Sequence, residues 1–323
     1  MNTKLQKSMV VGSFCFVAGL LLFLLHGNLI PAQANTSAGP ANVYLPLVQG
    51  DELPPASWIV FSQKVVREGQ NSLAILNAVN PQTGEVKVFP VQEENFGTLM
   101  PHASRDGKSI VLVQNQQLKV FNVETEALLG VPLPEGMKAL YPALSPDGAQ
   151  VAFTKNITPG RALQLVNLDG SNLRQLAQRE GYGFVRSVGW SPDGQTLLAQ
   201  TAPENGGKVE IVQVDVAAGN IVTRTFGTDP VWSFDGSKIA YAQNGISVVT
   251  QAWDMLYTLP VGFASDLAWS PDGKWLAYVD VSAAYGGNAC PTYCIKVVRS
   301  DGSGVPILIL NSAGYESSLS WMP

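Results

Sequence analysis

Histidine is nearly absent from this chain of 323 residues. There are two, and His26 lies in the N-terminal segment, which leaves His102 for the rest of the protein. A Ser-His-Asp triad would therefore have to use His102 as its base, and zinc sites built on several histidines are excluded. Neither the Gly-x-Ser-x-Gly elbow of α/β-hydrolases nor the Gly-x-x-x-x-Gly-Lys phosphate loop occurs in the sequence. We therefore expect no catalytic residues, no cofactor and no resident metal.

Cysteine is also scarce. Of three cysteines, Cys15 lies in the N-terminal apolar segment, whereas Cys290 and Cys294 flank the tripeptide Pro291-Thr292-Tyr293. An even number of cysteines in an exported protein favours a disulfide, so we predict that Cys290 and Cys294 are joined. The alternative is two free thiols in a loop. A metal site is disfavoured because two cysteines without nearby histidines supply too few ligands.

Charged residues make up 14% of the chain, with a net charge of −5, and no basic patch points to nucleic acid. Lys4 and Lys7 precede the uncharged run Met9–Leu25, and Ala32-Gln33-Ala34 resembles a cleavage site. This order predicts a signal peptide over residues 1–34, hence export to the periplasm, the cell surface or the medium. The alternative is an uncleaved membrane anchor, because 17 residues are at the lower limit for a span. Residues 35–57, rich in Ala, Pro, Ser and Gly, are predicted to be a linker.

One short phrase is repeated along the remainder of the chain. Its five copies are HASRDGKSIVLVQ (102–114), ALSPDGAQVAFTK (143–155), GWSPDGQTLLAQT (189–201), VWSFDGSKIAYAQ (231–243) and AWSPDGKWLAYVD (268–280). Each copy predicts two strands joined by a tight turn, because Pro, Asp and Gly favour turns and the second run is rich in β-branched and aromatic residues. Two more strands follow in each unit, and four antiparallel strands per unit of about 40–50 residues are typical of a propeller blade.

The two ends of the repeat region complete each other. The first unit, beginning at Trp58, has no Ser-Pro-Asp-Gly strand before it, and the half-copy LSWMP (319–323) has no unit after it. The last strand is therefore predicted to join the first blade and close the ring. The expected fold is all-β, a six-bladed β-propeller over residues 58–323.

The repeated W-S-P-D-G phrase resembles that of TolB-like six-bladed propellers, which also occurs in the propeller domains of prolyl-oligopeptidase-type enzymes. The resemblance covers nearly all of the chain after residue 57 and implies the fold, whereas propellers have many functions. Two copies depart from it at the proline, which is Arg105 in the first copy and Phe234 in the fourth. We expect these departures to weaken single turns. The repeated aspartates are interpreted as turn residues, and the repeated tryptophans as packing between blades rather than a stacking platform.

Binding residues are expected on the face opposite the Ser-Pro-Asp-Gly turns, where loops enter each blade. Counting four residues back from each repeat serine places a ring of residues at the channel rim, and His102 and Arg186 lie within two residues of it. The predicted binding residues are Met100, His102, Tyr141, Arg186, Ser187, Asp229, Asp266 and Glu316. The three acids could bind a cation or a basic peptide end. The alternative is a set of solvated acids at strand starts.

Three functions remain open. The first is a non-enzymatic exported propeller, expected to be a monomer, that binds a protein or peptide on its loop face. The second is a carbohydrate-binding surface protein that uses aromatic loop residues. The third is a hydrolase or lyase with an active site at the channel mouth, built from Asp229, Asp266, His102 and Arg186.

Overall fold

The structure, a computed structural model, describes residues 57–65, 72–94, 99–157, 160–282, 293–312 and 315–323. All of them belong to one compact unit, Ala32–Pro323. The predicted signal peptide, nearly all of the predicted linker and Cys290 lie outside the described residues. Within the described part, the regular structure is β-sheet, and no helix there is long and apolar enough to cross a membrane.

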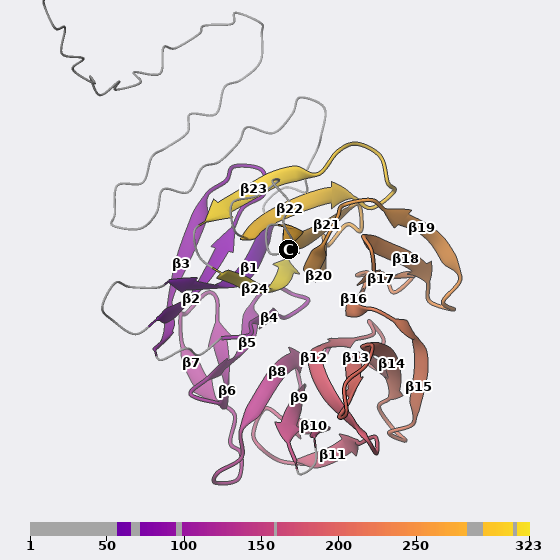
Figure 1. Ribbon diagram of the computed structural model, residues 1–323. Coiled ribbons are helices and arrows are strands. Elements are labelled where there is room, and N and C mark those ends of the chain that lie inside the picture. Colours follow the sequence, from indigo (N-terminus) through magenta and orange to yellow (C-terminus); the bar gives the residue numbers. More distant parts are fainter. Residues whose placement is uncertain (1–56, 66–71, 95–98, 158–159, 283–292, 313–314) are drawn as a thin grey trace, which may run out of the picture. The chain divides into compact units, whose positions relative to one another are not determined.

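Six four-stranded antiparallel sheets surround a common centre, as Figure 1 shows. We number them as blades in chain order and give each from its innermost strand outwards. Blade 1 consists of β24 (Tyr315–Met322), β1 (Trp58–Val65), β2 (Leu73–Val79) and β3 (Val86–Glu94). Blade 2 consists of β4 (His102–Ala103), β5 (Ser109–Gln114), β6 (Gln117–Asn122) and β7 (Leu128–Gly130). Blade 3 consists of β8 (Ala139–Leu144), β9 (Gln150–Asn156), β10 (Arg161–Asn167) and β11 (Arg174–Ala177).

The other three blades repeat this order. Blade 4 consists of β12 (Tyr182–Trp190), β13 (Thr196–Pro203), β14 (Glu210–Asp215) and β15 (Ile221–Phe226). Blade 5 consists of β16 (Thr228–Trp232), β17 (Lys238–Ala242), β18 (Ile246–Thr250) and β19 (Met255–Leu259). Blade 6 consists of β20 (Ala264–Trp269), β21 (Trp275–Asp280), β22 (Tyr293–Arg299) and β23 (Ile307–Ser312). The predicted six-bladed propeller is confirmed.

The C-terminal strand closes the ring. β24 pairs antiparallel with β1, with Trp58 opposite Met322 and Lys64 opposite Tyr315. Ser320 in β24 also contacts the next blade, because its Oγ accepts a hydrogen bond of 2.9 Å from the Ala103 backbone N–H. The predicted closure is therefore confirmed, and blade 1 combines the two ends of the repeat region.

The five Asp-Gly turns share one hydrogen-bonding pattern. In each, the serine hydroxyl donates to Oδ1 of the aspartate two residues later at 2.5–2.6 Å. The same Oδ1 accepts the backbone N–H two residues further on at 3.0 Å. The glycine that follows each aspartate has φ between 69° and 74°, which an L side chain rarely adopts. These aspartates thus stabilise the turns, on the face that we call the turn face.

The repeated tryptophans lie between neighbouring blades. Trp190 Nε1 of blade 4 donates to the Ala143 carbonyl of blade 3 at 3.0 Å, and Trp269 Nε1 of blade 6 donates to the Val231 carbonyl of blade 5 at 3.3 Å. Trp321 belongs to the apolar cluster between blades 6 and 1, together with Trp275. The innermost strands are thereby held side by side around the channel.

Candidate functional site: the central channel

The innermost strands break their register at one equivalent place. The register shifts lie between Leu140 and Ala143 in β8, Thr228 and Val231 in β16, and Ser265 and Ala268 in β20. A residue with positive φ stands at the break in each, and also in β24 and just before β4: Met100 (47°), Tyr141 (49°), Asp229 (52°), Asp266 (51°) and Ser318 (57°). Positive φ is uncommon outside glycine and needs support from its surroundings. Bulges of this kind redirect side chains, here to the channel end that we call the mouth.

This register corrects one sequence-based position. In blade 1 the residue equivalent to Asp266 is Ser318, not Glu316. Trp321 aligns with Trp269, so Met322 stands where the full copies have their turn serine. The sequence analysis counted four residues back from Ser320 instead of from Met322, and therefore reached Glu316, two residues before the bulge residue Ser318. The side chains of Glu316 and of Ser187, the expected member from blade 4, lie outside what the structure describes.

The bulge residues link neighbouring blades to one another. The Met100 sulfur accepts a hydrogen bond of 3.2 Å from the Tyr141 backbone N–H, and Asp266 Oδ1 accepts one of 2.9 Å from the Ser318 N–H. The Asp266 backbone N–H in turn stabilises the ionised Asp229 carboxylate and so lowers its pKa. At the mouth these contacts join blade 2 to blade 3, blade 5 to blade 6 and blade 6 to blade 1, and they hold the polar groups of those blades in place.

Two carboxylates are brought together at the mouth. Asp229 is 3% exposed and Asp266 is 9% exposed. Arg186 Nη2 reaches from blade 4 to both oxygens of Asp266 at 3.3 Å, and Gln200 Nε2 donates to Asp229 Oδ1 at 3.3 Å. Burial, and then the negative charge of Asp266, raise the pKa of Asp229 to about 6, against the smaller opposing effect of Arg186. A bound cation would favour the ionised form of Asp229.

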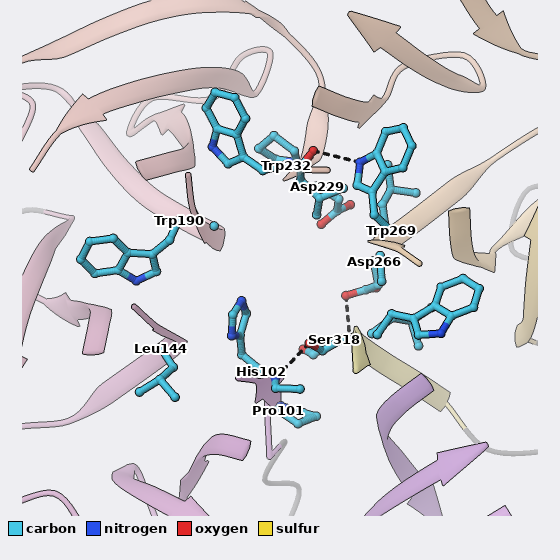
Figure 2. A pocket seen from close by; sticks show the side chains of 18 of the residues that line it. Pro101, His102, Leu144, Trp190, Asp229, Trp232, Asp266, Trp269 and Ser318 are labelled. Carbon is cyan, nitrogen blue, oxygen red and sulfur yellow. Dashed lines mark hydrogen bonds between the residues drawn. The ribbon is translucent and has the colours of Figure 1, made fainter. Parts of the chain in front are cut away.

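His102 lies on β4 and its ring points into the same space as Asp229 and Asp266 (Figure 2). Its Nδ1 is buried and has no hydrogen-bond partner among the described residues. Burial lowers the pKa of His102 to about 4, so the imidazole is neutral at pH 7. The described residues contain no group of three or more His, Cys, Asp or Glu side chains able to hold a metal ion.

Below the mouth lies a cavity of about 170 Å³, lined by residues from all six blades. Apolar side chains, among them Val231, Leu267, Ala268 and Leu319, share the walls with polar groups. The four tryptophans also border the cavity, and Figure 2 shows Trp190, Trp232 and Trp269 further out than the central polar groups. Trp190, Trp269 and Trp321 are at most 8% exposed, which agrees with packing between blades.

The opposite end of the cavity contains a contact that the sequence reasoning missed. Arg105, in the turn of blade 2, donates from Nη2 to the Phe234 carbonyl in the turn of blade 5, and its guanidinium lies 5.0 Å from the centroid of the Phe234 ring. Both residues border the cavity. Blades 2 and 5 are three apart in a ring of six, so the two side chains bridge the channel. We call this end of the cavity the floor.

Comparison with known proteins agrees with this architecture. The family model described as "TolB beta propeller domain" matches residues 65–283, which is more than half of the chain. The chain belongs to the TolB β-propeller family. The TolB structure from Acinetobacter baumannii covers 83% of this chain at 16% identity with a TM-score of 0.67, and the chain covers 67% of that structure. At this identity the structural likeness bears on the fold alone.

Curated relatives match over shorter stretches. The TolB homologue of Chlorobium luteolum is 34% identical over 107 residues, which are 32% of this chain and 23% of the relative. The "uncharacterized peptidase YuxL" of Bacillus subtilis is 25% identical over 201 residues, which are 55% of this chain and 28% of the relative. This TolB-family chain therefore spans about a quarter of the length of each of these relatives.

Proposed function

We propose that this TolB-family propeller is a non-enzymatic, exported binding protein, and that a protein or peptide partner places a basic group at the channel mouth. The observation that carries the proposal is the pair Asp229 and Asp266, two buried carboxylates held by strand bulges at the entrance of a cavity. Binding residues commonly lie where a rigid scaffold presents them, and bulges recur beside such sites.

The charges at the mouth favour a cationic ligand. Arg186 offsets one of the two carboxylates, so the mouth has a net charge of about −1 when Asp229 is ionised. Burying an unpaired charge is costly, and a cationic group from the partner would supply the missing counter-charge. This argument supports a Lys side chain, an Arg side chain or a free α-amino group as the part of the partner that enters the mouth.

The carbohydrate alternative receives less support. Sugar-binding sites use exposed aromatic faces, whereas three of the four repeated tryptophans are buried between blades. Export is supported by the N-terminal sequence, in which a basic start, an apolar run and a small-residue cleavage pattern follow one another.

A peptide-display selection tests the proposal. The immobilised full-length protein is screened against random heptapeptides at low and high salt, beside the Asp229→Asn/Asp266→Asn double variant. We expect peptides rich in Lys or Arg to be enriched by the wild type, with weaker binding at high salt and in the double variant. Asp169→Asn/Asp301→Asn is the matched control, because both residues are exposed and the change in net charge is identical. The proposal is wrong if both double variants select the same peptides as the wild type.

A further inference from the structure

Arg105 has a charge that no carboxylate neutralises directly. In the part of the chain that the structure describes there are three ion pairs, Arg179–Glu210, Arg186–Asp266 and Lys296–Asp280, and Arg105 belongs to none of them. The aspartate that acts on Arg105 electrostatically is Asp235, whose oxygens already accept hydrogen bonds from Ser233 and Ser237. Partial burial lowers the pKa of Arg105.

Arg105 also keeps donors for a ligand. A guanidinium has five N–H donors, and the described hydrogen bond of Arg105 goes to one neutral acceptor, the Phe234 carbonyl. Guanidinium groups bind carboxylates in a two-pronged geometry and with a stronger bond than a neutral pair forms. An anionic group of a ligand at the floor would therefore find an unused, partly desolvated cation.

The two ends of the cavity are thus lined by side chains of opposite charge. The mouth has a net charge of about −1 from Asp229, Asp266 and Arg186, whereas the floor is bordered by the guanidinium of Arg105, whose positive charge Asp235 in the turn of blade 5 offsets in part. Between them apolar side chains, among them Val231, Leu267 and Leu319, share the walls with polar groups such as the neutral His102. A ligand that satisfies both ends needs a cation, an anion and an apolar stem that separates them.

The size of the cavity limits the ligand. A cavity of about 150 Å³ holds a benzene molecule, so 170 Å³ accommodates one small molecule or one side chain rather than a folded segment. Met100 and Arg105 are five residues apart, so the backbone between them spans at most roughly 18 Å when fully extended. The bulge at Met100, the turn at Arg105 and the side chains at both ends shorten the free distance.

We propose that the channel binds a small zwitterion, with a carboxylate that reaches Arg105 at the floor and an ammonium group that remains beside Asp229 and Asp266 at the mouth. The ligand class is a linear ω-amino acid of about six carbons or a compound of equivalent length. The ammonium half of this site rests on the proposed function, whereas the carboxylate half is independent of it.

Three probes of one chain length separate the two halves: 6-aminohexanoate, hexylamine and hexanoate. Calorimetric titration of the full-length protein at pH 7.5 should show 6-aminohexanoate binding at least about tenfold more tightly than hexylamine or hexanoate. Arg105→Gln should abolish the tighter binding of 6-aminohexanoate relative to hexylamine, and should leave the affinity for hexylamine unchanged. Asp229→Asn should weaken hexylamine and leave hexanoate unchanged or tighter.

Two variants control for folding and for net charge. Arg105→Lys keeps the positive charge at the floor and should retain part of the preference for the zwitterion. Arg224→Gln removes one positive charge beside Trp253, away from the cavity, and should bind all three probes like the wild type. Melting temperatures of all variants are compared with that of the wild type.

The inference is overturned if the wild type binds 6-aminohexanoate no better than hexylamine, if Arg105→Gln keeps the full preference, or if no probe binds in the millimolar range. If hexylamine binding depends on Asp229 but Arg105 affects the binding of none of the probes, the zwitterion site is refuted and the proposed function is retained. Hexanoate binding that depends on Arg105, without any amine binding, would refute both the ammonium half of the site and the basic-group part of the proposed function, and would leave only the carboxylate half at Arg105.

Discussion

Arg105 and Phe234 lie 129 residues apart in the chain and contact each other across the channel. Each replaces the proline of its repeat copy, and the two copies stand three blades apart. The loss of proline at two turns is thus accompanied by one contact, in which the guanidinium bonds a backbone carbonyl and lies over an aromatic ring. This pairing makes the two departures from the repeat a single feature of the channel floor.

We predict an energetic coupling between these two residues. A double-mutant cycle with Arg105→Ala and Phe234→Ala, measured by urea unfolding, should give a coupling free energy of about 0.5–2 kcal/mol, because the cation–π contact is partly desolvated. Pro192 occupies the equivalent turn position in blade 4, so Arg105→Ala combined with Pro192→Ala is the control and should be additive. Additivity of the Arg105 and Phe234 variants would contradict the floor contact.

The aspartates of the repeat should matter for stability and not for binding. Asp193 Oδ1 accepts hydrogen bonds from Ser191 Oγ and the Gln195 N–H, so Asp193→Ala should lower the free energy of unfolding by roughly 1 kcal/mol. The Ser191 hydroxyl, followed by the Gln195 N–H, holds the pKa of Asp193 below its usual range. The stabilisation is therefore present above the unfolded pKa near 3.8 and is lost as the pH falls through the folded pKa.

The pH dependence supplies the check. The destabilisation by Asp193→Ala, measured by chemical unfolding, should shrink in acid and be largest near neutral pH. Peptide binding at the mouth should be unchanged, since the turn lies on the other face. A loss of binding at unchanged stability would move the functional site to the turn face.

The closure by β24 should be essential for cooperative folding. Deleting residues 317–323 removes the buried Trp321 and Met322 and leaves β1 without its inner neighbour, so the truncated chain should lose its single unfolding transition. Ser320→Ala, which removes one hydrogen bond to Ala103, should cost about 1 kcal/mol and keep the transition cooperative. A truncated protein that melts like the full chain would contradict this role.

The pairing of Cys290 with Cys294 stays a prediction. Cys294 is buried at the start of β22, opposite Asp280, and Cys290 lies outside the described residues. The closed loop is short, so the disulfide should add little to global stability. Intact-mass analysis of the exported protein after alkylation without reductant should show no modified thiol. Two alkylated thiols would refute the pairing.

The repeated phrase was sufficient to predict the blades, the closure by the half-copy and the turn role of Asp193, because local turn chemistry and strand pattern determine them. The mouth could be predicted only in part. Counting along the chain found Asp229 and Asp266 but placed Glu316 where the bulge puts Ser318, since the half-copy lacks its turn serine. The Arg105–Phe234 contact depends on which blades face each other across the ring, and each residue taken alone suggested only a weak turn.

The last prediction concerns the cost of keeping Asp229 buried. Its pKa is raised from 3.8 to about 6, first by burial and then by Asp266. Between these values Asp229 holds a proton in the folded protein that it has lost in the unfolded chain, so its contribution to stability falls as the pH rises through this range, whereas His102, whose pKa is lowered, contributes in the opposite direction. A shift of about two units corresponds to a loss of up to about 3 kcal/mol above pH 6.

Asp229→Asn should therefore raise the free energy of unfolding at pH 7.5 and leave it unchanged near pH 3.5. Asp266→Asn is the matched comparison: it removes the charge that pairs with Arg186 and also the repulsion on Asp229, so at pH 7.5 it should leave the protein less stable than Asp229→Asn does. His102, whose pKa is lowered, titrates in both variants alike, so the difference between them isolates the carboxylates. Chemical unfolding across this pH range measures both curves, and an Asp229→Asn variant less stable than the wild type at pH 7.5 would show that the buried carboxylate stabilises the mouth.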